Sequence, residues 1–518
     1  MKKNIPLYCF VVLICISIVL AFVLNFYLVI NPLKKLDDED YTFEKFTDDT
    51  QKQYTSNFFA RESFINLNGL FTRLIGKKTT NNVDKMKNGM LVNSNIIYRD
   101  TSNLANSIKQ FSSHLKENDV KFVYIQLPMK VDLENSLIYD GYVNYANQNA
   151  NELLGKLGND VSFIDMRKYI VSTPEQVEKY FYHTDHHWNT YGAFEAYKVV
   201  LNYLNEEFPE QCFDLSNADI NNWNATVYED WFLGSLGKRV GKLYAGVDDL
   251  TLLTPKFDTD MSMYVTNHRK FFNGNFENAV MDNSYLDKRD YFHENPYCSY
   301  IGGDYPLVNH INNNASNDLK VLIIKDSFTL PLQAFLSTSV KELDVIDARY
   351  FTECTIAEYV NVSKPDIVIM SINPSVFGET KYQKFGIDEA SYHTNQTEKI
   401  EIVKNQSFKL QSNSNYYYKA VLSGLSYNTK YTVSFDNINC SNEGVDGVTV
   451  ALYNKDSKKI ISSYVFNLDF CKQNGFEWSF VTPDIKSGNL QILVYAGLHS
   501  QAKGNTVEYQ GLTVYKYE

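Results

Sequence analysis

Hydrophobic and polar positions follow one pattern over most of the chain and a different one near its end. Up to about residue 392, apolar runs alternate with segments of helical periodicity, such as Leu104, Ile108, Phe111 and Leu115. The apolar runs have the length of buried strands and cover 121–128, 161–165, 320–325, 342–347 and 366–373. Strands that alternate with helices predict an α/β fold built on a parallel sheet.

From about residue 393, apolar and polar residues alternate, turn residues separate the runs, and helical periodicity is absent. The alternating runs are 431–435, 448–453, 476–480, 490–495 and 507–515. They predict a C-terminal β-sandwich over residues 393–518, most simply a jelly roll. Residues 36–392 would form the catalytic domain. Within it, residues 205–318 are less periodic, and we interpret them as an insertion that shapes a substrate cleft.

The N-terminal segment from Ile5 to Ile30 is almost wholly apolar, with Asn25 as its one strongly polar residue. As a helix it would be about 39 Å long, enough to cross a bilayer. No convincing signal-peptidase pattern is present, so residues 1–35 predict an uncleaved transmembrane anchor. Lysines flank both ends of the segment, and the charges therefore do not decide its orientation.

Composition narrows the possible partners. The 518 residues are enough for two or more domains, and the net charge of −12 without a long basic run argues against nucleic acid. The 7 cysteines are scattered without zinc-site spacing. Either a Cys440–Cys471 disulfide or isolated buried thiols fit this pattern. No cofactor is predicted.

One short motif, Asp185-His186-His187-Trp188, concentrates groups that can do chemistry. A general base requires an imidazole oriented by a carboxylate, which makes His187 the candidate base and Asp185 its partner. Trp188 is a candidate to line the substrate cleft or to pack beneath it. Two other interpretations are a metal site that includes His183 and His186, and a helix cap with surface histidines. No second ligand cluster stands out, so we predict no metal.

A candidate nucleophile, Ser327, follows the strand 320–325 and precedes a plausible helix start. Such a turn exposes a hydroxyl at the carboxyl edge of a parallel sheet, where free helix N–H groups, including that of Ser327, can hold an oxyanion. Asn373 is a second candidate oxyanion donor, although Asn-Pro is also an ordinary turn. Arg349 either binds an anionic substrate group or pairs with a nearby aspartate, Asp347 or Asp326.

The order of these blocks resembles a circularly permuted SGNH hydrolase. Ser327, the Asp347–Arg349 segment and Asn373 follow three successive strands, whereas the Asp185–His187 pair comes upstream. Asp-His-His-Trp with Gly192-Ala193, together with Lys-Asp-Ser-Phe at 325–328, is similar to the DHHW protein family and to alginate O-acetyltransferases of the AlgX/AlgJ type. The strand-ending Pro-x-Lys at 128–130 also matches. The resemblance covers roughly residues 55–385.

The resemblance implies a triad of Ser327, His187 and Asp185 that O-acetylates a cell-envelope or secreted polysaccharide through an acyl-serine intermediate. It also implies a membrane-bound O-acyltransferase as donor partner and a catalytic domain on the extracytoplasmic side of the cell membrane. The sandwich occupies the position of a carbohydrate-binding module. Two alternatives stay open: a carbohydrate esterase (deacetylase) with the same triad, and a non-catalytic glycan-binding assembly protein.

Overall fold

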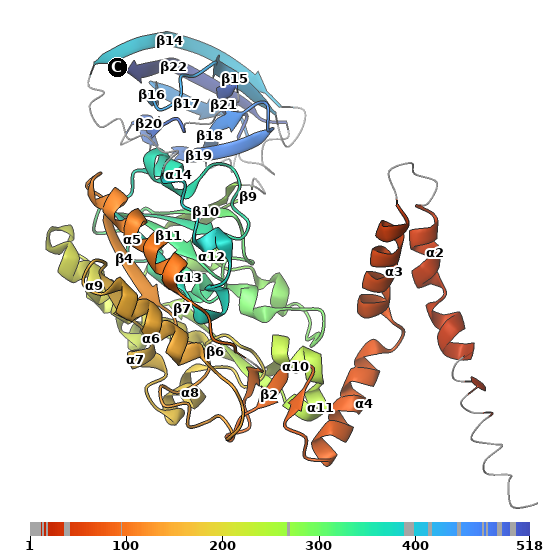
Figure 1. Cartoon of the computed structure of the whole chain (residues 1–518). Helices are drawn as coiled ribbons and strands as arrows, with labels where there is room; N and C mark the ends of the chain where they lie inside the picture. The colour runs from red at the N-terminus through yellow and green to blue at the C-terminus, as the bar shows by residue number, and fades with distance from the viewer. Residues whose placement is uncertain are drawn as a thin grey trace, which may run out of the picture.

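The computed structural model places an α/β region in the middle of the molecule, with the C-terminal strands above it and the N-terminal helices to the right, joined to its lower end (Figure 1). The structure describes residues 12, 15–16, 19–35, 42–94, 96–266, 270–387, 398–412, 417–442, 447–468, 471–472, 475–483, 489–497 and 504–518. Every structural statement below refers to these residues.

A mixed sheet forms the centre of the α/β region. Its strand order, within the described residues, is β5-β4-β13-β11-β12-β10-β8-β9. The first five strands are parallel: β5 (Phe163–Asp165), β4 (Lys121–Gln126), β13 (Ile367–Ile372), β11 (Lys320–Lys325) and β12 (Glu342–Asp347). These are the five apolar runs of the sequence, and the prediction of an α/β fold with a parallel sheet is confirmed.

Helices cover both faces of this sheet. On one face, α5 (Ser102–Lys116), α6 (Ala146–Leu157) and α14 (Ile356–Ser363) pack against alternate strand residues such as Leu322 and Ile324. On the other face, α9 (Thr190–Glu207) and α13 (Thr329–Leu336) pack against Val321 and Ile323. Because both faces are buried, the strands read as continuous apolar runs rather than alternating ones.

Part of residues 205–318 extends the central sheet. Three antiparallel strands extend it: β10 (Leu307–Asn312), β8 (Met261–Val265) and β9 (Lys270–Gly274). The remaining elements are a hairpin of β6 (Trp223–Phe232) and β7 (Asp248–Pro255) with the short helices α10 (Ser235–Val240), α11 (Lys242–Ala245) and α12 (Phe276–Val280). Polar residues such as Asn309 and His310 interrupt the apolar pattern of β10, which is why periodicity did not identify it.

The C-terminal strands form two antiparallel sheets. In the described part, the orders are β14-β22-β16-β20, with β17 also on β22, and β15-β21-β18-β19. The bounds are β14 (Lys399–Gln411), β15 (Tyr418–Ser423), β16 (Lys430–Phe435), β17 (Asn437–Cys440), β18 (Gly447–Asn454), β19 (Lys459–Asn467), β20 (Phe476–Val481), β21 (Leu490–Tyr495) and β22 (Thr506–Tyr517). The chain crosses repeatedly between the two sheets, as in a jelly roll. Cys440 and Cys471 are free thiols, so the disulfide considered above is not formed.

The structure does not support the predicted single-pass anchor or the cell-membrane location inferred from it. Residues 1–11, 13–14 and 17–18 of this segment lie outside the described part, and no described helix is long and apolar enough to cross a bilayer. A turn at Phe26 separates residues 19–25 from α2 (Tyr27–Leu33), although the Phe26 backbone keeps helical angles of φ −59° and ψ −33°. The buried Asn25 side chain donates to Ala21 O at 2.8 Å and accepts from Phe59 N at 2.7 Å. Asn25 thereby ties this apolar segment to the turn between α3 (Phe43–Asn57) and α4 (Arg61–Leu74).

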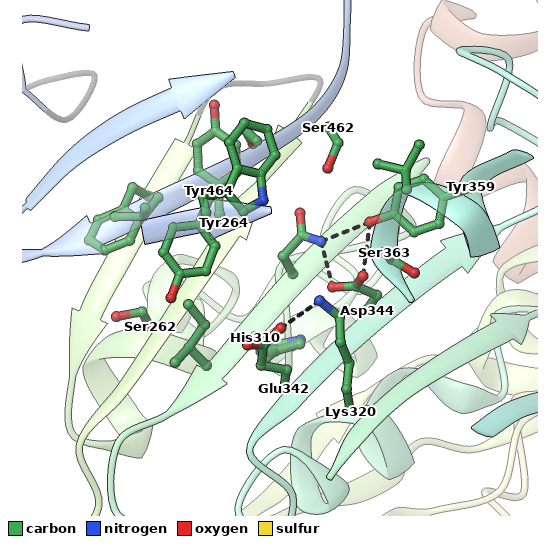
Figure 2. A pocket seen from close by; sticks show the side chains of 17 residues that line it. Ser262, Tyr264, His310, Lys320, Glu342, Asp344, Tyr359, Ser363, Ser462 and Tyr464 are labelled. Atoms are coloured by element: carbon green, nitrogen blue, oxygen red, sulfur yellow. Dashed lines mark hydrogen bonds and ion pairs between the residues drawn. The ribbon is translucent and has the colours of Figure 1, made fainter. Parts of the chain in front are cut away.

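A cavity lies between the central sheet and the sandwich (Figure 2). Lys320 and Glu342, the first residues of β11 and β12, form an ion pair at 2.6 Å beside it. Asp344 accepts hydrogen bonds from Asn309 Nδ2 at 2.6 Å and from the Tyr359 hydroxyl at 3.0 Å. The cavity therefore lies at the amino ends of the parallel strands, at the edge of the sheet opposite to Ser327.

Removing the Tyr359 hydroxyl tests the polar network at this interface. Burial raises the pKa of Asp344, and the charge of Lys320 and the bonds from Asn309 and Tyr359 oppose that rise. We expect Tyr359→Phe to lower the free energy of unfolding by about 1–3 kcal/mol, because a buried carboxyl group loses a donor. Urea denaturation measures it, with Tyr350→Phe, an exposed tyrosine, as the control. Equal unfolding midpoints for the two variants would contradict this account.

Candidate active site

The segment that carries Asp185 and His187 lies between a bridge of Phe181 to Trp188 and the start of α9. The Asn189 side chain caps α9 by accepting from Gly192 N at 3.0 Å. Gly192 is required here because an added Cβ would lie 2.6 Å from Tyr180 O. The glycine of the motif therefore allows α9 to pack closely against the preceding chain.

Ser327 lies between the carboxyl end of β11 and the start of α13 and is half-buried. Its Oγ is 2.8 Å from His187 Nε2, although the two residues are 140 positions apart. His187 Nδ1 lies 2.6 Å from Asp185 Oδ1, which also accepts from the His187 backbone N–H at 3.0 Å. The structure thus brings the three predicted residues into one hydrogen-bonded chain.

Asp185 is ionised in this setting. Burial opposes its charge, but the neighbouring imidazoles of His186 and His187 and the hydrogen bonds from His187 hold its pKa well below the ordinary value. Its second oxygen, Oδ2, accepts from Ser235 N at 2.5 Å. A carboxylate on Nδ1 holds the proton at that nitrogen and leaves Nε2 able to take a proton from Ser327.

Trp188 packs beneath the site, which is one of our two expectations for it, and its role in substrate binding stays a prediction. Its side chain is fully buried, and Nε1 donates to Phe328 O at 2.8 Å. Phe328 also packs edge-on against the Trp188 ring. Trp188 therefore joins the segment that carries His187 to the segment that carries Ser327.

Tyr297 is a site residue that the sequence did not reveal. Its ring is stacked on the His187 imidazole, with 4.1 Å between the centroids and 15° between the planes. Its hydroxyl donates to Ser327 O and Phe328 O at 3.2 and 3.1 Å. Tyr297 comes from the non-periodic region, where no local pattern distinguishes it from many other aromatic residues.

The two predicted oxyanion donors have different surroundings. Asn373 donates to Asp326 Oδ2 from both its backbone N, at 2.8 Å, and its side-chain amide, at 2.6 Å. Burial raises the pKa of Asp326 to about 6. The Ser327 backbone N–H has no hydrogen-bond acceptor among the described residues. Ser327 N is therefore available to an oxyanion, and the role of Asn373 stays a prediction.

Arg349 pairs with an aspartate, which is one of the two interpretations that the sequence allowed. Its guanidinium binds both oxygens of Asp347, at 2.9 and 2.6 Å, and Asp304 Oδ2 at 2.9 Å. Lys325 joins the same cluster through Asp304 and Asp347. Two cations and two carboxylates balance one another here, so the charge of Arg349 is already compensated before any substrate binds.

A metal ion would have to compete with these bonds. The ligand atoms of Asp185, His186 and His187 lie within 4.8 Å of one another. Both His187 nitrogens are occupied by Asp185 and Ser327, and His186 Nδ1 lies 2.8 Å from Ser235 Oγ. A metal ligand set would therefore break the chain that leads to Ser327.

The close approach of Gly234 to Asp185 gives a test of this geometry. A Cβ at Gly234 would lie 2.2 Å from Asp185 Cβ, so Gly234→Ala must displace the carboxylate. We expect a loss of about 100-fold in the kcat/KM for a p-nitrophenyl ester, the effect of a misplacement of about 1 Å. Gly155→Ala is the control, because nothing lies within 4 Å of its added Cβ. Equal rates for both variants would refute the assigned role of Asp185.

Comparisons with known proteins agree with the resemblance inferred from the motifs. Residues 92–222 match the family described as "SGNH hydrolase-like domain, acetyltransferase AlgX", a range that contains Asp185 and His187 but not Ser327. No curated protein matches the sequence.

Three solved structures are similar to this chain. PatB1 of Bacillus cereus is 23% identical and covers 57% of this chain and 97% of its own, with a TM-score of 0.48. A DHHW family protein from Eubacterium siraeum DSM 15702 is 20% identical and covers 59% and 95%, with a TM-score of 0.45. AlgX of Pseudomonas aeruginosa is 10% identical and covers 86% and 98%, with a TM-score of 0.35. The family match relates this chain to SGNH-like acetyltransferases of the AlgX type over residues 92–222.

Proposed function

We propose that this protein is an O-acyltransferase that transfers an acetyl group to a hydroxyl of a polysaccharide through an acyl-Ser327 intermediate. The hydrogen-bonded chain Ser327–His187–Asp185 carries the proposal, because these side chains lie at the 2.6–2.8 Å separations that proton transfer needs. The family match over residues 92–222 supports acetyl transfer in general.

In the first half-reaction, Ser327 Oγ attacks the carbonyl carbon of the acyl donor, and His187 Nε2 takes the hydroxyl proton. The tetrahedral intermediate then expels the leaving group, which receives that proton from His187. Ser327 N–H faces the oxyanion during this step. A donor of this kind stabilises the transition state by about 3–4 kcal/mol.

In the second half-reaction, a sugar hydroxyl attacks the acyl-serine and gives its proton to His187. The new ester forms as the bond to Ser327 Oγ breaks, and Oγ recovers the proton from His187. Asp185 remains ionised throughout and stabilises the imidazolium. The donor, for which a membrane-bound O-acyltransferase was predicted, and the polysaccharide acceptor are part of this proposal.

The same residues serve an esterase if water replaces the sugar hydroxyl. A non-catalytic assembly protein is less well supported, because a scaffold has no need for an aligned serine, imidazole and carboxylate. We also propose that the sandwich binds carbohydrate, which would raise the effective concentration of acceptor chains.

Replacing Ser327 tests the nucleophile. We expect the protein to release p-nitrophenol from p-nitrophenyl acetate and Ser327→Ala to lower kcat by at least about 1,000-fold, because the attacking oxygen is lost. Mass spectrometry of quenched wild-type protein should show an acetyl group on Ser327. Ser375→Ala, an exposed serine beyond β13, is the matched control. Undiminished hydrolysis by Ser327→Ala would exclude the assignment.

Adding an acceptor separates transfer from hydrolysis. With oligosaccharides present, we expect acetylated sugar to accumulate and free acetate to fall in proportion, because both products draw on one acyl-serine. Mass spectrometry of the sugars and an acetate assay measure the partition. If acetate remains the sole product at every acceptor concentration, the esterase alternative replaces the transferase.

A further inference from the structure

Lys130 is a buried cation that the proposed chemistry does not use. It follows β4 by four residues and is 2% exposed. Its Nζ donates to Tyr182 O at 2.9 Å, to His183 O at 3.1 Å, and to Asp185 O. An ammonium group has three hydrogens, so all of its donors are used on one stretch of backbone.

Asp248, the first residue of β7, binds the amide groups of the same stretch. Its carboxylate accepts from His183 N at 2.7 Å, from Thr184 N at 2.8 Å and from Thr184 Oγ1 at 2.5 Å. This backbone is buried and irregular, so its polar groups need partners that secondary structure does not supply. Lys130 donates hydrogen bonds to the carbonyl oxygens of this stretch, and Asp248 accepts hydrogen bonds from its amide groups.

We propose that Lys130 and Asp248 form a two-sided clamp on the backbone of residues 182–185 and thereby position Asp185 and His187 against Ser327. Lys130 is a positioning residue in this account, because it acts on Asp185 O and not on a reacting atom. The inference rests on the proposed role of the Ser327–His187–Asp185 chain. A displacement of about 1 Å at such a site can cost about 100-fold in rate.

The clamp depends on the charge of Lys130. Burial lowers its pKa to about 7, and the carboxylates of Asp248 and Asp185 oppose that lowering. A neutral amine has two hydrogens, so deprotonation leaves one of the three carbonyls without a donor. The charged and titratable groups that face Lys130 are Asp185 and His186 on the motif and Asp248 on β7.

Activity and stability then change in opposite directions with pH. Below a pH of about 7 the folded protein keeps the ammonium and its three bonds, and above it the clamp weakens. The unfolded chain holds this proton up to a pH of about 10.4, so the Lys130 contribution to folding stability rises between these values. A loss of activity over this range is therefore not explained by unfolding at Lys130.

The test compares Lys130→Met with Lys198→Met, a partly exposed lysine on α9 that pairs with Glu195. Phenylmethanesulfonyl fluoride labelling of full-length protein measures the reactivity of Ser327, and proton NMR detects the hydrogen-bonded Nδ1–H of His187. We expect about 100-fold slower labelling and a lost or shifted Nδ1–H resonance for Lys130→Met, with Lys198→Met unchanged. Wild-type labelling per folded Lys130→Met molecule would overturn the clamp.

A second variant keeps the test decisive if Lys130→Met does not fold. Asp248→Asn retains Lys130 but removes the carboxylate that raises its pKa, so the alkaline fall in labelling should move to lower pH. If the pH of this fall in labelling does not change, the clamp is also overturned.

The NMR resonance and the labelling do not require acyl transfer. A protein that is labelled at Ser327 but acylates no acceptor would refute the proposed function and leave the clamp intact.

Discussion

The hydrogen bond from Trp188 Nε1 to Phe328 O is the contact on which the rest of the site depends. It joins two segments that are far apart in the chain, one next to His187 and one next to Ser327. The Trp188 ring is fully buried against Phe328, so the same contact combines apolar burial with a satisfied indole N–H. Tyr297 adds a second link, because its ring stacks on His187 while its hydroxyl binds the carbonyls of Ser327 and Phe328.

Buried charge around the site is balanced in small groups. Lys325, Arg349, Asp304 and Asp347 form one such group at the carboxyl ends of β11 and β12. Lys130 and Asp248 form another around the backbone of residues 182–185. An uncompensated charge in such places would be costly, whereas paired and hydrogen-bonded charges can be buried. Such groups give the irregular backbone around the candidate catalytic residues hydrogen-bond partners that secondary structure does not supply.

The sandwich and the candidate active site lie at opposite edges of the central sheet. The cavity between sandwich and sheet is lined by Lys320 and Glu342, at the amino ends of their strands, whereas Ser327 follows the carboxyl end of β11 (Figure 2). A polysaccharide bound to the sandwich would have to pass along the side of the α/β region to reach Ser327. The proposed role of the sandwich is therefore to concentrate the polymer rather than to complete the catalytic site.

Local pattern determined a large part of this protein. The strands at 320–325 and 342–347 have the predicted bounds because a strand buried on both faces must be apolar throughout. Asp185 and His187 were recognisable because a D-x-H spacing lets one carboxylate oxygen bind both the backbone N–H and the ring of the histidine. Ser327 was recognisable because a strand-to-helix turn places its hydroxyl at the sheet edge.

Only the tertiary structure decided which distant groups meet. Asp248 and Tyr297 contact the site from segments whose local sequence gives no sign of it, and the Pro-x-Lys at 128–130 did not reveal which backbone Lys130 binds. Trp188 and Arg349 have side chains that suit a cleft as well as a buried pair, and only the tertiary structure shows that they bind Phe328 and Asp347. Hydropathy also predicted a membrane span. A hydropathy average over a window of residues does not register the hydrogen bond that Phe59 N donates to the Asn25 side chain. Periodicity indicates which residues of one helix or strand share a face. It does not indicate hydrogen bonds between residues that are far apart in the sequence.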